Sequence, residues 1–228
     1  MAPWREVENA LEEIINDYEK VNHFISLFQD EKIRFEGLSR IGRVNGVSLE
    51  LGSGPGNFSE SILNHIDSQL ICVDYSNVML AAAAERLRKK GANFIRGTFE
   101  NIPIREGVIS FTGTSFALRD SLQKRRVLTQ IKSVLRVHGK LLVVDIGKPN
   151  NRVTRGFFAL YMKYIVPLIS ALTTKYGLRN PWRMLYKTYT HLPENYKLLH
   201  LTEKVIGCAV LTEKARGSLV ILTAEKIP

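Results

Sequence analysis

A glycine-crowded turn next to acidic residues is the strongest chemical signal in the chain. Residues 47–57 read V-S-L-E-L-G-S-G-P-G-N, so Gly52, Gly54 and Gly56 follow an apolar run. Glycines at alternate positions let the backbone approach a ligand closely and adopt positive φ. Asp74 stands eighteen residues past Gly56, at the end of the next apolar run. This spacing fits a β-α-β unit that binds a nucleoside-like ligand and holds a carboxylate near its ribose diol.

The glycine spacing distinguishes two classes of cofactor. A dinucleotide fingerprint reads G-x-G-x-x-G, whereas residues 50–56 read E-x-G-x-G-x-G, and Asn57 stands where the last glycine would fall. That form resembles the first motif of class I S-adenosylmethionine (SAM) methyltransferases. A helix that begins near Asn57 would point its free N–H groups at the ligand. The turn therefore favours SAM over NAD, and glycines that serve tight packing alone are the alternative.

Alternating strands and helices must position this turn. The pattern predicts a leading helix over residues 4–29, a helix with Ser76 at its N-cap that ends at Gly91, and a helix over 121–136. Five strands are expected at 47–51, 70–74, 94–96, 109–116 and 141–146. Such alternation predicts a parallel, doubly wound sheet whose strands all end at one rim. Residues on or just after that rim are Gly52, Asp74, Thr98, Ser115 and Asp145.

The pattern changes after Pro149. Residues 152–189 are helical, aromatic and basic, which predicts a helical cap inserted before a late hairpin of strands at 205–211 and 218–224. The apolar run 157–172 has only sixteen residues and contains Lys163 and Pro167, whereas a spanning helix needs about twenty. We expect this run to lie on a membrane or pack on the core, not to cross a bilayer.

The basic charge of the chain is confined to its second half. Residues 1–120 hold 13 Lys and Arg against 17 Asp and Glu, whereas residues 121–228 hold 19 against 5. No acidic residue lies between Ile146 and Pro193. Basic residues that alternate with aromatic ones suit contact with an anionic membrane. An RNA surface, a solvated face and a homodimer interface are the alternatives.

Length and composition favour one α/β domain over residues 1–228, with a helical segment at 1–40 and the cap at 150–192. The two cysteines have no metal-ligand spacing, and neither H-x-x-x-H nor C-x-x-C occurs, so no metal is expected. The first residues lack the form of a signal peptide. We expect a cytoplasmic protein that meets the inner face of the membrane peripherally.

Several separate motifs resemble those of the ubiquinone/menaquinone biosynthesis C-methyltransferases. Residues 18–22, Y-E-K-V-N, are similar to the family's Y-D-x-x-N, and residues 74–80 are similar to its D-x-x-x-x-M-L. Residues 115–120, S-F-A-L-R-D, resemble S-F-G-L-R-N, although Asp120 stands where the family has Asn. Residues 144–149 resemble V-L-E-F-S-K-P.

This resemblance implies a seven-stranded Rossmann-like sheet with an antiparallel last strand, and SAM as methyl donor. The acceptor it implies is a prenylated aromatic ring of the demethylmenaquinol or ubiquinol type. Phe99 departs from the small residue that the family places beside the adenine. The expected SAM contacts are Glu50, Gly52, Ser53, Gly54, Pro55, Gly56, Asp74, Tyr75, Met79, Thr98, Phe99 and Ser115.

The acceptor side depends on fewer residues. The sulfonium of SAM is already activated, so the protein needs mainly to position a nucleophilic carbon, and a cation beside a ring hydroxyl would lower the barrier. Arg119, with Asp120 beside it, is the catalytic candidate, and a surface ion pair is the alternative. The expected acceptor contacts are Tyr18, Asn22, His23, Arg119 and Asp145, and each has a plain structural alternative.

Two other functions stay open at this point. One is an enzyme that methylates another small molecule, a lipid or an RNA, although no RNA-binding module is recognisable. A SAM-binding protein without catalysis belongs to a different class. Intact acidic and glycine residues at 50–56 and 74 argue against a decayed donor site.

Overall fold

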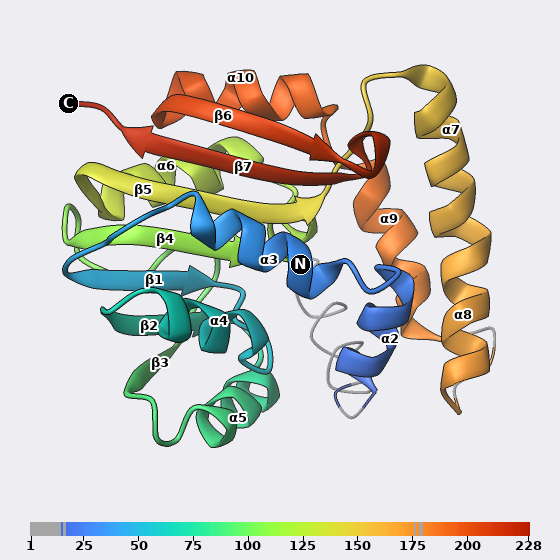
Figure 1. Ribbon diagram of the computed structural model, residues 1–228, viewed down its shortest axis with the longest axis horizontal. Coiled ribbons are helices and arrows are strands. Elements are labelled where there is room, and N and C mark those ends of the chain that lie inside the picture. The colour runs from blue at the N-terminus through green and yellow to red at the C-terminus, as the bar shows by residue number, and fades with distance from the viewer. Residues whose placement is uncertain (1–14, 16, 176, 178–179) are drawn as a thin grey trace.

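A seven-stranded mixed sheet forms the centre of the computed structural model, which describes residues 15, 17–175, 177 and 180–228. The strand order is β3-β2-β1-β4-β5-β7-β6. β1 to β5 pair in parallel, and β7 runs antiparallel to both β5 and β6 (Figure 1). The expected doubly wound sheet with an antiparallel last strand is therefore confirmed. Its strands are β1 (Val47–Leu51), β2 (Gln69–Asp74), β3 (Ala92–Arg96), β4 (Ile109–Ser115), β5 (Leu135–Ile146), β6 (Gly207–Lys214) and β7 (Leu219–Lys226).

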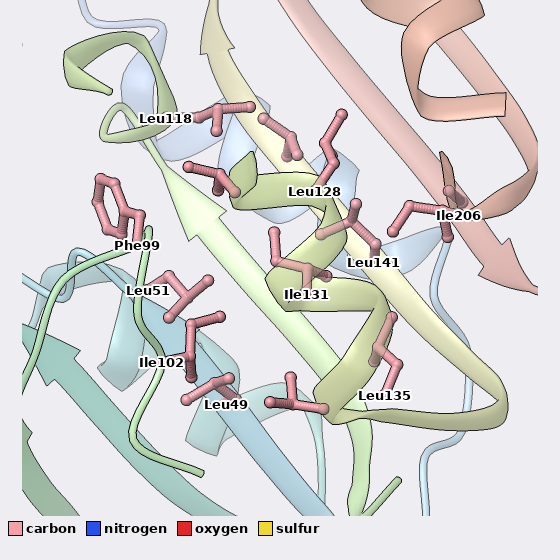
Figure 2. Packing of buried hydrophobic residues seen from close by; sticks show 14 of the residues in the cluster. Leu49, Leu51, Phe99, Ile102, Leu118, Leu128, Ile131, Leu135, Leu141 and Ile206 are labelled. Carbon is pink, nitrogen blue, oxygen red and sulfur yellow. The ribbon is translucent and has the colours of Figure 1, made fainter. Parts of the chain in front are cut away.

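Helices cover both faces of the sheet. One face carries α3 (Asp30–Ser39), α4 (Asn57–His65) and α5 (Asn77–Arg86), and the other carries α6 (Lys124–Val134) and α10 (Asn195–Val205). Figure 2 shows Leu128 and Ile131 of α6 packed toward Leu141 of β5. These three side chains are fully buried, as is expected where an amphipathic helix lies on a parallel sheet.

The leading segment differs from the single helix expected over residues 4–29. Residues 1–14 and 16 lie outside the described part, and α2 covers only Tyr18–Ile25. Leu27 and Phe28 have φ angles of 52° and 59°, left-handed values that a helix cannot contain. The chain therefore turns there and starts α3 at Asp30. Apolar spacing continues through this turn, which is why periodicity alone did not reveal it.

The helix after β2 is also shorter than expected. Ser76 caps it as predicted, because its hydroxyl accepts a hydrogen bond from the Met79 N–H. However, α5 ends at Arg86, and Gly91 closes the turn that follows with a φ of 74°. The glycine signal marked the end of the turn, five residues beyond the end of the helix.

A long helix dominates the cap (Figure 1). It runs without a break through α7 (Arg152–Leu160), the π-helical segment η2 (Tyr161–Ile165) and α8 (Val166–Thr173). Pro167 does not interrupt it. A proline ring clashes with the carbonyl four residues earlier in an α-helix, and here that residue, Lys163, lies in the wider π turn. The cap continues through η4 (Pro181–Arg183) and α9 (Met184–Thr190).

The helix that contains this segment is longer than the sixteen-residue apolar run counted from sequence. Among the described residues, one helix, Arg152–Thr173, is long and apolar enough to cross a membrane, judged by length and composition alone. One face of this helix packs on the protein, since Met162, Val166 and Ser170 are buried. α8 contacts α2, so the long helix lies beside the leading segment at the carboxyl rim of the sheet (Figure 1).

Candidate functional site

The glycine turn between β1 and α4 has the backbone that its sequence predicts. Gly52, Gly54 and Gly56 have φ angles of 70°, 53° and 90°, and α4 begins directly afterwards. Asp74 ties this turn to β2: its Oδ2 accepts a hydrogen bond from the Gly54 N–H at 2.8 Å, and its Oδ1 accepts one from the Ser76 N–H at 2.9 Å. The carboxylate is therefore held at the rim, beside the turn.

Buried polar atoms beneath the glycine turn are available to a polar ligand. Glu50 is buried under the turn, where the Ser59 hydroxyl donates to its Oε2 and burial raises its pKa to about 8. Among the described residues, its Oε1 and the buried Ser53 hydroxyl have no hydrogen-bond partner. Buried polar atoms of this kind are costly unless a ligand or water satisfies them. These atoms fit the amino acid part of SAM chemically.

The remaining expected SAM contacts surround the turn. The ring of Phe99 is buried beside Gly52, where an added Cβ would lie 2.8 Å from the ring and 2.5 Å from Ala117. Tyr75, which follows Asp74, lies under the Arg96 guanidinium at 5.1 Å. Pro55 and Met79 are buried, Thr98 is half-buried, and their contact with SAM stays a prediction.

An apolar cavity of about 220 Å³ adjoins the rim at the ends of β4 and β5. The leading segment, the cap and the turn between β6 and β7 close it. Its apolar wall includes Phe116, Ile146, Phe158, Tyr161, Leu185 and Leu219. Its polar wall includes Asn22, Asp30, Arg34 and Arg119. A mostly apolar hollow with a few convergent polar groups is the usual form of a small-molecule site.

Arg119 reaches this cavity from η1 (Leu118–Asp120), and Asp145 of β5 holds it there. The Arg119 N–H donates to Asp145 Oδ2 at 3.0 Å, and its Nη1 lies 3.4 Å from Oδ1. Asp120 Oδ1 lies 3.6 Å from the Arg119 Nε. Burial raises the pKa of Asp145, and it raises that of Asp120 to about 6. Lys124 Nζ donates to the Arg119 carbonyl at 3.1 Å, and burial lowers its pKa.

A second arginine, Arg34 of α3, packs against the same aromatic ring, Phe116, as Arg119 does. The guanidinium carbon of Arg34 lies 5.6 Å from the ring centroid of Phe116, and that of Arg119 lies 6.0 Å from it. Arg34 Nε also donates to the hydroxyl of Ser115 at 3.0 Å. Because Ser115 is an expected SAM contact, Arg34 connects the donor side of the rim with the acceptor cavity.

The structure separates the expected acceptor contacts. Asn22 and Arg119 line the cavity, whereas Asp145 lies behind Arg119 and supports it. His23 lines a neighbouring polar groove, and its Nδ1 lies 2.8 Å from Asp30 Oδ1. The side chain of Tyr18 lies outside the described part of the structure.

Asp30, Arg34 and Phe116 are among the cavity-wall residues that the sequence interpretation did not assign to the acceptor site. The first two belong to α3, a helix that the periodicity did not predict, because the expected leading helix ended at residue 29. Phe116 belonged to the S-F-A-L-R-D motif, and its φ of 54° is a backbone signal that composition cannot show. Within the described residues, no group of three His, Cys, Asp or Glu side chains could hold a metal ion.

A family model described as the ubiE/COQ5 methyltransferase family matches residues 3–221. The chain belongs to this family. It is 26% identical over 220 residues to the demethylmenaquinone methyltransferase of Lactococcus lactis, covering 94% of this chain and 86% of that one. It is also 26% identical to the ubiquinone/menaquinone biosynthesis C-methyltransferase of Blochmanniella floridana, covering 84% and 75%.

The solved structures agree on the fold. A SAM-dependent methyltransferase of Thermotoga maritima superposes with a TM-score of 0.68 at 17% identity, covering 96% of this chain and 99% of that one. This ubiE/COQ5 family member is thus a SAM-dependent methyltransferase with the class I fold. Binding of the methyl donor at the glycine turn stays a prediction.

The buried Glu50 should make stability depend on pH. Its pKa rises from 4.5 to about 8 on folding, so between these values the folded state holds a proton that the unfolded state has released. The free energy of unfolding should therefore fall as pH rises from 5 to 8, by up to about 1 kcal/mol per pH unit. We expect Glu50→Gln to flatten this fall in urea titrations.

The exposed Glu106 provides the matched control. Glu106→Gln should leave the pH dependence of the wild type unchanged. Parallel curves for wild type and Glu50→Gln would show that Glu50 does not carry this proton.

Proposed function

We propose that this methyltransferase transfers the methyl group of SAM to a ring carbon of a demethylmenaquinol or a related prenylated quinol. One observation carries the proposal: the apolar cavity beside the SAM rim contains the Arg119 guanidinium, fixed by Asp145. The names of the relatives in Lactococcus lactis and Blochmanniella floridana support the same acceptor class.

The proposed chemistry requires the protein mainly to position the ring carbon in line with the methyl group of SAM. Bound SAM supplies a methyl group on a sulfonium, which is already a good leaving group. The apolar wall around Phe116 and Phe158 would hold the ring dry and in line with that methyl group. Arg119 would stabilise the negative charge that develops on a ring oxygen when its proton leaves. Asp120 and Asp145 would keep the guanidinium in position.

The direct test offers labelled SAM to three acceptors. The purified chain should methylate demethylmenaquinol, and tRNA and phospholipid should stay unlabelled. Label in tRNA alone would refute a quinol acceptor, and no label in any acceptor would favour a SAM-binding protein without catalysis.

Arg119→Lys tests the residue in the same assay. Lysine keeps a charge for Asp145 but loses the planar fork, so we expect kcat to fall by roughly 100-fold with SAM binding unchanged. Arg125 is exposed on α6, and Arg125→Lys should match the wild type. Equal rates for Arg119→Lys and Arg125→Lys would show that the Arg119 side chain does not take part in the reaction.

We also propose that the long cap helix rests peripherally on an anionic membrane. Its outer face carries a continuous apolar stripe at helical spacing: Val153, Phe157, Leu160, Tyr164, Leu168 and Leu172. Exposed cations flank this stripe, among them Arg152, Lys163 and Lys175. An apolar face between basic residues suits the headgroup region of a bilayer. The same helix lines the acceptor cavity through Phe158 and Tyr161, so a lipid-borne quinol would have a short path.

Vesicle flotation tests this surface. Wild type should float with vesicles that contain phosphatidylglycerol, and high salt should weaken the binding. Phe157→Glu with Leu172→Glu should abolish flotation, because these residues are 71% and 79% exposed. Val137→Glu is the control, since Val137 is 47% exposed on β5, away from the stripe. Unchanged flotation of the double variant would contradict the proposal, and a loss of dimers instead would assign the stripe to self-association.

A further inference from the structure

Asp30, the first residue of α3, faces two hollows at once. Only 6% of its surface is exposed. It lines the acceptor cavity with Arg34 and Arg119, and it also lines a polar groove of about 970 Å³. The groove runs between α2, α3 and the start of α4 and includes His23 and Asn57. The apolar cavity and the polar groove thus meet at one carboxylate.

The contacts of Asp30 hold one of its oxygens and leave the other available. Oδ1 lies 2.8 Å from His23 Nδ1 and accepts a hydrogen bond from the Ser26 hydroxyl at 2.8 Å. Within the described part of the chain, Oδ2 has the Arg34 Nη1 at 3.6 Å, which is longer than a hydrogen bond. A carboxylate fixed through one oxygen can accept a proton at the other.

We propose that Asp30 is the general base that removes the hydroxyl proton of the acceptor. This inference rests on the proposed quinol acceptor. The hydroxyl O–H bond breaks and its proton goes to Asp30 Oδ2. The negative charge left on the oxygen is delocalised into the ring and stabilised by Arg119. The ring carbon forms the new C–C bond, and the electron pair of the broken S–CH₃ bond stays on sulfur.

The polar groove gives the proton that is released in each turnover a path to solvent. The methylated ring carbon loses its hydrogen as a proton and the ring oxygen regains one, so a single proton leaves per turnover. Because Asp30 also lines the polar groove, it can release that proton to water there without opening the apolar cavity. His23 and Arg34 act as positioning residues, since they hold the carboxylate from α2 and from the next turn of α3.

The alternative is a structural role in which Asp30 only joins α2 to α3. Asp30→Asn separates the two, because the amide keeps the shape of the side chain and can still accept from Ser26. We expect kcat for demethylmenaquinol to fall roughly 100-fold or more, with KM, SAM affinity and melting temperature close to those of the wild type. Asp67 is exposed and lines neither hollow, so Asp67→Asn gives the matched control, which should retain full activity.

A binding measurement without SAM gives an independent readout. 1-Naphthol can donate a hydrogen bond to Asp30, whereas 1-methoxynaphthalene cannot. Wild type should prefer the naphthol by roughly tenfold, and Asp30→Ala should lose this preference. If the role of Asp30 were purely structural, Asp30→Ala would weaken the binding of both ligands equally.

These outcomes separate the two proposals. Wild-type methylation of the quinol together with full activity of Asp30→Asn would overturn the role of Asp30 and leave the proposed function intact. An equal preference for the naphthol in Asp30→Ala and wild type would also overturn the role of Asp30 and leave the proposed function intact. No quinol methylation by the wild type would overturn both.

Discussion

The buried pair between Arg119 and Asp145 is the constraint on which the candidate site depends. Asp145 accepts both the backbone N–H and the guanidinium of Arg119, so the segment after β4 must fold back against the end of β5. That fold fixes Ser115 and Phe116, the first beside the donor side of the rim and the second in the acceptor cavity. Breaking a buried pair leaves one charge without its counterpart, which is strongly destabilising. The same interaction therefore orders the loop and positions a cation.

The two sides of the site have opposite physical character because different elements build them. The donor side consists of backbone, with positive φ glycines and Asp74 held by two N–H groups. The acceptor side consists of aromatic and aliphatic side chains from the leading segment and the cap, with cations placed at its base. On the proposed function, the charged, polar donor and the lipophilic acceptor would meet at the end of β4, next to Arg34 and Arg119.

Much of this arrangement could be predicted from sequence, because the strongest signals are local. The glycine turn, Asp74 and the alternation of strands and helices are short-range patterns, and they located the sheet and its rim correctly. The S-F-A-L-R-D motif led to Arg119 for the same reason. Asp30 and Arg34 were missed because they enter the cavity only after a tight turn at Leu27 and Phe28, which apolar spacing does not reveal. The π turn before Pro167 likewise lets one long helix continue past a proline that the sequence interpretation had counted against a spanning helix.

The most direct test of this account is the position of the acceptor in a structure with S-adenosylhomocysteine and a demethylmenaquinone bound. We expect the sulfur at the glycine turn and the ring stacked near Phe116, with one ring oxygen within hydrogen-bond distance of Arg119. The ring carbon that accepts the methyl group should face the sulfur across the space that one methyl group fills. A ring bound outside the cavity, or one that faces the sulfur with Arg119 turned away, would contradict the account.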